Sequence, residues 1–201
     1  LSGSSGDTAE AGVATASGED DGASTEVATA SAEESREVEL FLGVCGVGKT
    51  VSALAVQEIC TGLSPELLLL GGMGGGLAPG LELGSVIIAD EVQQWDVDAT
   101  AVGLEPGEVP FLPTPPGVKK RGVEKRGVLR LEPGLCSRAA SIAGVLGSSC
   151  VGKIVTGDSF LGRNERERKE RIREKTGAIL VDMEGWSAAY AAAVCEVPLL
   201  L

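Results

Sequence analysis

The sequence predicts an α/β domain with a largely parallel or mixed sheet. Short apolar segments that are typical of buried strands alternate with longer segments that carry the spacing of helices. Glycine-rich turns separate these segments, and no internal repeat is visible. The chain has 201 residues, a length that allows one domain with a substantial core.

The expected strands and helices follow one another from residue 38 onwards. The expected strands are 38–42, 67–70, 85–89, 153–156, 178–181 and 199–201. The expected helices are 50–60, 135–146, 163–175 and 186–194. Gly, Pro and charged residues dominate 103–125, where we expect a long irregular loop. The helix at 163–175 carries Glu and Arg at i,i+4 spacing (Glu167 and Arg171), which is typical of a solvated face.

The N-terminal segment differs in composition from the rest of the chain. Residues 1–35 contain eight acidic residues, no basic residue and almost no large apolar side chain. Such a segment buries too little apolar surface to offset the entropy cost of ordering it. We therefore expect residues 1–36 to form a disordered acidic tail and residues 37–201 to form the domain.

Charge and cysteine usage limit the possible partners and the compartment. The net charge of −12 argues against nucleic acid, which needs a basic surface, and against anionic membranes. No apolar run approaches the roughly 20 residues of a membrane span, and the sequence shows no signal peptide. The five cysteines are scattered without a CxxC pair, which is typical of free thiols in a reducing compartment. We therefore expect a cytoplasmic protein.

The absence of histidine limits the chemistry. With no histidine in the chain, a His-based triad and a His-ligated metal site are both excluded. Any reaction must then use carboxylates, hydroxyls, lysine, backbone amides or a cysteine.

One motif suggests a nucleotide-hydrolysing protein. The sequence GVCGVGKT at 43–50 satisfies the P-loop pattern G-x-x-x-x-G-K-[ST], between an expected strand and an expected helix. Asp182 and Glu184 would then supply a Mg²⁺ ligand and a neighbouring base. This hypothesis leaves segments 71–79, 96–110 and 156–161 without a role. On the alternative interpretation, Lys49 is a surface lysine beside a turn.

A series of motifs gives every one of these segments a role. In chain order they are Gly-x-Gly-Lys (46–49), a Gly-rich loop (71–76), Leu-x-x-Gly-Ser-Val-Ile-Ile-Ala-Asp (81–90), Asp-x-Asp-Ala-Thr (96–100), Thr-Gly-Asp-Ser-Phe (156–160) and Val-Asp-Met-Glu-Gly (181–185). The series resembles the purine nucleoside phosphorylase/nucleosidase superfamily over 38–201. Segment 95–110 resembles a loop of the 5′-methylthioadenosine/S-adenosylhomocysteine nucleosidases. Segment 67–70 lacks the arginine with which phosphorylases of this superfamily hold phosphate.

The resemblance implies a fold, an activity and an assembly. The implied fold is a three-layer αβα domain with a mixed, partly closed central sheet. The implied activity is hydrolysis of 5′-methylthioadenosine or S-adenosylhomocysteine to adenine and a thioribose derivative, a step of methionine salvage. The resemblance implies no metal and no organic cofactor. The implied assembly is a homodimer in which the loop at 103–116 covers the 5′-group of the nucleoside bound to the neighbouring subunit. The alternatives are a purine or uridine nucleoside phosphorylase, a non-catalytic nucleoside-binding relative and the P-loop NTPase.

The resemblance also implies a set of substrate-binding residues. They are Met73, Gly74, Gly75, Phe160, Leu161, Asp182, Met183 and Glu184. Glu184 would accept hydrogen bonds from the ribose 2′- and 3′-hydroxyls while Met183 packs on the sugar. Phe160 would stack on adenine and the backbone of Leu161 would contact the edge of the adenine ring.

Two functional groups of the family map to no residue of this sequence. The carboxylate that positions the attacking water would fall in the acidic tail, and the Asp that protonates the purine would follow residue 201. A positioned acid or base contributes roughly 10²–10⁴-fold to a rate. The resemblance therefore implies little or no turnover by this chain, as a fragment or as a degenerate member.

In the substrate-binding set implied by the resemblance, Gly74 and Gly75 would let the backbone approach the substrate closely.

Overall fold

The computed structural model describes residues 38–110, 112 and 127–201. Contacts divide the chain into two units, 1–41 and 42–201, and the fold below is that of the second unit. The expected tail at 1–36 and most of the expected loop at 103–125 lie outside the described residues. The division into a tail at 1–36 and a domain at 37–201 stays a prediction.

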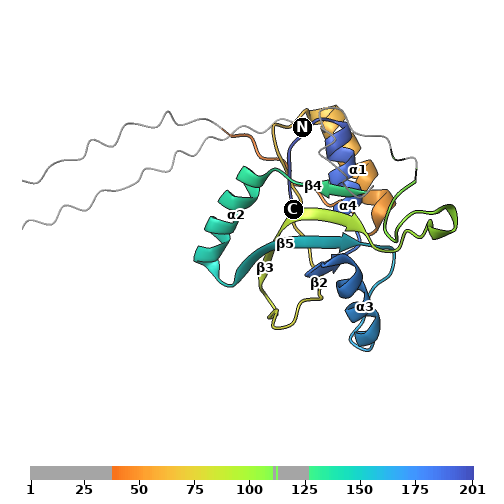
Figure 1. Cartoon of the computed structure of the whole chain (residues 1–201). Helices are drawn as coiled ribbons and strands as arrows, with labels where there is room; N and C mark the ends of the chain where they lie inside the picture. The colour runs from red at the N-terminus through yellow and green to blue at the C-terminus, as the bar shows by residue number, and fades with distance from the viewer. Residues whose placement is uncertain (1–37, 111, 113–126) are drawn as a thin grey trace, which may run out of the picture. The chain divides into compact units, whose positions relative to one another are not determined.

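A five-stranded mixed sheet forms the centre of the domain (Figure 1). In spatial order its strands are β2 (Gly75–Gly76), β6 (Leu180–Asp182), β5 (Ser149–Thr156), β3 (Val86–Gln94) and β4 (Val128–Arg130). Strands β6, β5 and β3 run parallel, whereas β2 and β4 run antiparallel to their neighbours at the two edges. The expected α/β class with a mixed sheet is confirmed.

The sheet is open in the described part of the chain, and not partly closed as expected. Strands β1 (Leu68–Leu69) and β7 (Leu199–Leu200) form a separate parallel pair. The register of β3 against β5 shifts after Ala89, and there the Ala89 N–H donates to the carbonyl of Leu201 at 2.9 Å. Leu201 is the residue after β7, so this hydrogen bond links the β1–β7 pair to β3 without adding a strand to the larger sheet.

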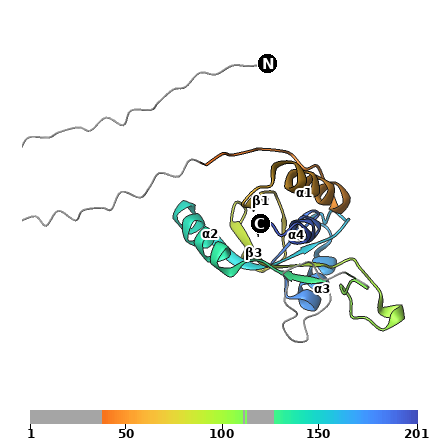
Figure 2. The ribbon, with the colours of Figure 1, turned by 90° about the horizontal axis from the view of Figure 1, so that it is seen from above.

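Helices lie on both sides of the sheet, as Figures 1 and 2 show from two directions. They are α1 (Lys49–Leu63), α2 (Pro133–Leu146), α3 (Arg166–Thr176) and α4 (Gly185–Val194). Helices α1 and α4 pack together on one face, and α3 lies on the other. No helix in the part of the chain that the structure describes is long and apolar enough to cross a membrane.

Two neighbouring residues of β5 show how the layers are separated. Ile154 belongs to the apolar core beneath α1 and α4, which also contains Val92 of β3. Val155 belongs to a different core, in which it packs with Ile172 of α3. Successive side chains of a strand point to opposite faces, so the sheet lies between two helical layers. This arrangement confirms the expected three-layer architecture.

Local sequence explains where the helices begin. The Glu132 carboxylate accepts hydrogen bonds from the N–H groups of Gly134 and Leu135, and Pro133 occupies the first turn of α2. Helix α1 begins after Gly48, whose φ of 98° favours glycine. The N-cap residue of α1 is Gly48, which has no side chain that could cap the helix. The first N–H groups of α1 therefore need partners from elsewhere in the chain.

Most expected elements occur, with different ends, and one does not. Residues 38–42 form no strand, and Val38, Leu40 and Leu42 are 78%, 87% and 97% exposed. A strand requires a neighbour for its backbone groups, and no partner strand pairs with this segment among the described residues. The sequence did not indicate β2, β4 or the short 3-10 helix η1 (Thr100–Val102), since two or three residues carry no recognisable pattern.

A comparison of two valines on β3 tests the assignment of the core. Val92 is fully buried whereas Val86 is 42% exposed. We expect Val92→Ala to lower the free energy of unfolding by about 2 kcal/mol, because it removes buried methyl groups and leaves a cavity. Val86→Ala is the matched control and should cost less than about 1 kcal/mol. Urea denaturation measures both, and equal losses would contradict this placement of β3.

Candidate active site

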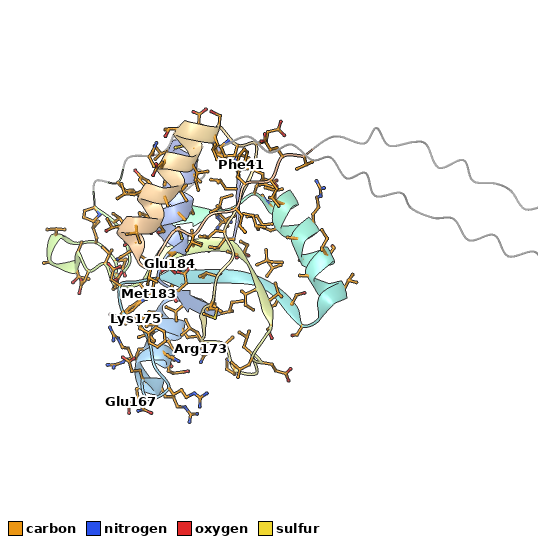
Figure 3. All side chains as sticks on the ribbon, turned by 180° about the vertical axis from the view of Figure 1, so that it is seen from behind. Phe41, Glu167, Arg173, Lys175, Met183 and Glu184 are labelled. Carbon is orange, nitrogen blue, oxygen red and sulfur yellow. The ribbon has the colours of Figure 1, made fainter. Side chains whose placement is uncertain are left out.

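Polar residues gather where the parallel strands end. Asp96 follows β3, Asp158 follows β5, and Met183 and Glu184 follow β6. The carboxyl ends of parallel strands share one edge of a sheet, which is where ligands bind in open α/β folds. The N-terminus of α1 reaches the same place, and Figure 3 shows Met183 and Glu184 beside that end of the helix. This edge of the sheet is the candidate active site.

The Glu184 carboxylate is held by two backbone groups. The Gly48 N–H donates to Oε1 at 2.7 Å, and the Met183 N–H donates to Oε2 at 3.3 Å. Gly48 is the residue before α1, and Glu184 is the residue before α4. The carboxylate therefore lies at the N-terminal ends of two helices, where their dipoles favour a negative charge.

Asp182 lies beside Glu184 in a more buried setting. The Thr156 hydroxyl donates to Oδ1 at 2.6 Å and the Gly185 N–H donates to Oδ2 at 2.8 Å. The Thr156 oxygen in turn accepts the Trp186 N–H at 2.8 Å. Burial raises the pKa of Asp182 to about 6; the hydrogen bonds from Thr156 and Gly185 oppose this rise and the charge of Glu184 adds to it.

Lys49 connects three segments of the site. Its ammonium group lies 2.9 and 3.0 Å from the two oxygens of Asp96, 3.1 Å from Asp158 Oδ2 and 3.0 Å from Gln94 Oε1. Desolvation alone would lower the pKa of Lys49, but hydrogen bonds and charges from Asp96 and Asp158 outweigh it and raise the pKa. Its side chain is only 18% exposed, so the interpretation of Lys49 as a surface lysine is wrong.

The loop after β5 carries two of the expected substrate-binding residues. Its first part is fixed, because the Asp158 N–H donates to Asp96 Oδ2 at 2.8 Å. Phe160 is 84% exposed, and Leu161 is buried in the core beneath α3. The loop is thus anchored at both ends and presents an aromatic ring between them.

The Gly-rich loop lies against β6, next to the acidic residues. Gly75 pairs with Val181, the residue before Asp182. A Cβ at Gly74 would overlap the Leu180 side chain, so packing accounts for glycine there. Met73 just before it is 98% exposed. A contact of these residues with substrate stays a prediction.

The structure therefore brings together four of the eight residues that the motifs selected, and adds others. Asp182, Met183 and Glu184 lie at the end of one strand, and Gly75 lies on the strand beside it. The substrate-binding set did not contain Thr156, Lys49 or Asp96, although each stands inside one of the quoted motifs. Within the residues that the structure describes, no cluster of three or more Cys, Asp or Glu side chains is arranged to hold a metal ion.

Comparison with known proteins identifies the class to which this fold and site belong. A family model described as the phosphorylase superfamily matches residues 6–201. The chain belongs to this superfamily, which confirms the resemblance seen in the motif series.

Its relatives include nucleosidases. The 5′-methylthioadenosine/S-adenosylhomocysteine nucleosidase of Staphylococcus aureus (strain MRSA252) is 29% identical over 166 residues, 83% of this chain and 67% of that protein. A mutant Helicobacter pylori MTAN with 5′-methylthioadenosine in the active site matches at TM-score 0.67 and 25% identity, over 78% of this chain and 62% of that chain. The Neisseria meningitidis nucleosidase in complex with methylthio-immucillin-A matches at TM-score 0.65 and 28% identity, over 78% and 63%. This chain thus spans about two thirds of their length.

The raised pKa of Asp182 predicts a pH-dependent effect of Asp182→Asn. The folded carboxyl group, with its pKa of about 6, binds a proton more tightly than the unfolded chain, where the pKa is about 4. The resulting stabilisation is complete below about pH 4 and is lost as pH rises through about 6. The free energy of unfolding of the wild type minus that of the variant should therefore fall by on the order of 2 kcal/mol between about pH 4 and pH 7.

Denaturant titrations across this pH range measure the difference, and a constant value would contradict the buried setting of Asp182. Asp98→Asn is a control of opposite sign. The N–H and hydroxyl groups of Thr100 lower the pKa of Asp98, so its contribution should be present at neutral pH and lost as pH falls.

Proposed function

We propose that this protein is a nucleosidase that hydrolyses the N-glycosidic bond of 5′-methylthioadenosine or S-adenosylhomocysteine. The products are adenine and a thioribose derivative. Nucleosidase relatives at 28–29% identity support the reaction class. The resemblance of the loop at 95–110 to that of these nucleosidases supports the choice of substrate.

The observation that carries the proposal is the fixed carboxylate of Glu184. Cleavage of an N-glycosidic bond passes through a sugar with oxocarbenium character. Each oxygen of Glu184 accepts one backbone N–H, and a carboxylate has about four lone-pair positions in all. The remaining positions suit the two hydroxyls of a vicinal diol, and the negative charge stabilises the developing cation. Met183, next in the chain, packs on the sugar in this proposal.

The base of the nucleoside would lie against the loop after β5. Phe160 offers an exposed ring for stacking on adenine, and the backbone of Leu161 would contact the adenine edge. Gly74 and Gly75 would border the sugar from the strand beside Asp182. No metal or organic cofactor takes part in this proposal.

Water is favoured over phosphate as the nucleophile because of the charges at the site. The ammonium of Lys49 is already engaged by the carboxylates of Asp96 and Asp158. Segment 67–70 contains no basic residue. A phosphate anion would approach Glu184 and the two aspartates without a cation to hold it, whereas water carries no charge. The same reasoning disfavours the P-loop NTPase, since the Gly48 N–H and Lys49 would both have to leave carboxylates for a triphosphate.

The proposed setting follows from the family resemblance. We propose a homodimer that acts in methionine salvage in the cytoplasm, with no nucleic-acid or membrane partner. Apolar side chains exposed near the site support a covering subunit: Val47, Leu54 and Met73 are 74%, 65% and 98% exposed. The cysteines at 45, 60, 136, 150 and 195 are free thiols, which suits a reducing compartment.

Calorimetric binding of 5′-methylthioadenosine tests the proposal without depending on turnover. We expect the wild-type chain to bind and Glu184→Gln to bind about 10–100-fold more weakly, because hydrogen bonds to a charged group contribute roughly 1.5–3 kcal/mol. The amide oxygen of Gln can still accept the Gly48 N–H, so the fold should be retained.

Glu174→Gln on α3 is the matched control, because Glu174 is exposed and lies outside the site, and its affinity should equal that of the wild type. Failure of the wild-type chain to bind the nucleoside would overturn the proposal. Binding of ATP·Mg²⁺ that requires Lys49 would favour the P-loop NTPase. Phosphate-dependent release of ribose 1-phosphate would favour a phosphorylase.

A further inference from the structure

The P-loop-like motif at 43–50 contains the most connected polar side chain of the site, and the proposed reaction assigns it no task. Lys49 ends this glycine-rich turn and starts α1. Its ammonium group faces side chains from two other segments of the chain. The contacts of Lys49 with Gln94, Asp96 and Asp158 therefore need a function that the proposed reaction does not supply.

We propose that Lys49 is a positioning residue of the candidate active site. Its ammonium holds the segment after β3 and the loop after β5 together, and so sets loop 157–161 for the base of the nucleoside. This inference rests on the proposed function for its ligand, and on the geometry alone for its effect on the loop.

The charges explain why a cation is needed at this point. Asp96 and Asp158 are drawn together by the hydrogen bond from the Asp158 N–H to Asp96 Oδ2, and both carboxylates reach the same ammonium. Without Lys49, two like charges would remain in close proximity and repel each other. Asp96 is only 19% exposed, whereas Asp158 is 60% exposed, so water screens this repulsion mainly from the side of Asp158.

The same helix terminus also positions the proposed ribose-binding carboxylate. The Gly48 N–H donates to Glu184 Oε1, and the Ser52 hydroxyl one turn later lies 3.3 Å from the carbonyl oxygen of Glu184. The start of α1 therefore contacts Glu184 through its backbone and the loop after β5 through the Lys49 side chain. A displacement of either group would change the distance between the sugar and base subsites, to which binding and catalysis are sensitive.

Lys153 provides a matched control for Lys49. Lys49 is the first residue of α1 and Lys153 lies within β5. Their side chains are 18% and 16% exposed. Lys153 also faces a carboxylate, with its Nζ 3.8 Å from Glu91 Oε2. Glu91 and Lys153 both lie inside strands, each three residues before the end of β3 and of β5.

The experiment compares Lys49→Met, Lys49→Arg and Lys153→Met with the wild-type chain. Methionine retains most of the length of lysine without its charge, and arginine retains the charge with a different geometry. The first readout is hydrogen exchange of the amides of 157–161 in the absence of ligand. The second is the dissociation constant for 5′-methylthioadenosine, and the third is thermal stability.

We expect Lys49→Met to accelerate exchange in 157–161 and to raise the dissociation constant, each by about tenfold. Exchange in the core strands should be unchanged, Lys49→Arg should restore part of both effects, and Lys153→Met should behave as the wild type. Equal losses of protection throughout the chain in both methionine variants would overturn the inference, since Lys49 would then be merely structural. Unchanged exchange of 157–161 in Lys49→Met would overturn it too.

The two proposals fail in different ways. If the wild-type chain does not bind the nucleoside, the proposed function fails, while the exchange of 157–161 still decides whether Lys49 holds the loop. If the loop loosens in Lys49→Met but the affinity for the nucleoside is unchanged, Lys49 does not position the loop for this ligand and the inference is overturned with the proposed function intact.

Discussion

The close packing of α1 against α4 is the constraint on which the site depends. Ser52 of α1 and Ser187 of α4 are buried, and their hydroxyl oxygens lie 3.2 Å apart. Ala188 beside them is fully buried, and small residues of this kind allow two helix backbones to approach closely. The approach brings the Gly48 N–H within 2.7 Å of the Glu184 carboxylate. One helix contact therefore fixes both the start of α1 and the Glu184 carboxylate.

The acidic residues of the site then occupy three different electrostatic environments. Glu184 lies at two helix N-termini, which favour its charge. Burial raises the pKa of Asp182 to about 6 in spite of its hydrogen bonds. Asp96 and Asp158 are paired with a lysine. Carboxylates a few residues apart in the chain thus differ in their burial and in the partners that hold their oxygens.

Local patterns in the sequence predicted most of the fold. Helices α1, α2 and α4 and strands β3 and β5 each extend over enough residues for apolar spacing to be recognisable. Strands β2 and β4 have only two and three residues. They form because they pair with β6 and β3, and short segments of this kind carry no recognisable pattern. The expected strand at 38–42 is absent, because an apolar segment becomes a strand only where another strand pairs with it. Alternation of elements indicated the α/β class, whereas the family resemblance implied the three layers and a partly closed sheet, and the sheet of the described residues is open.

The sequence by itself determined the class of protein, which rests on continuous motifs in a fixed order, and it selected Glu184 as a candidate site residue. It did not determine what GVCGVGKT does, because that pattern serves equally for a phosphate loop, a surface turn or a positioning device. The partners of Lys49 are remote: Asp96 lies 47 residues away, and Asp158 lies 62 residues beyond Asp96. Only the tertiary structure, by bringing the carboxyl ends of β3 and β5 to the start of α1, decided that this lysine faces carboxylates.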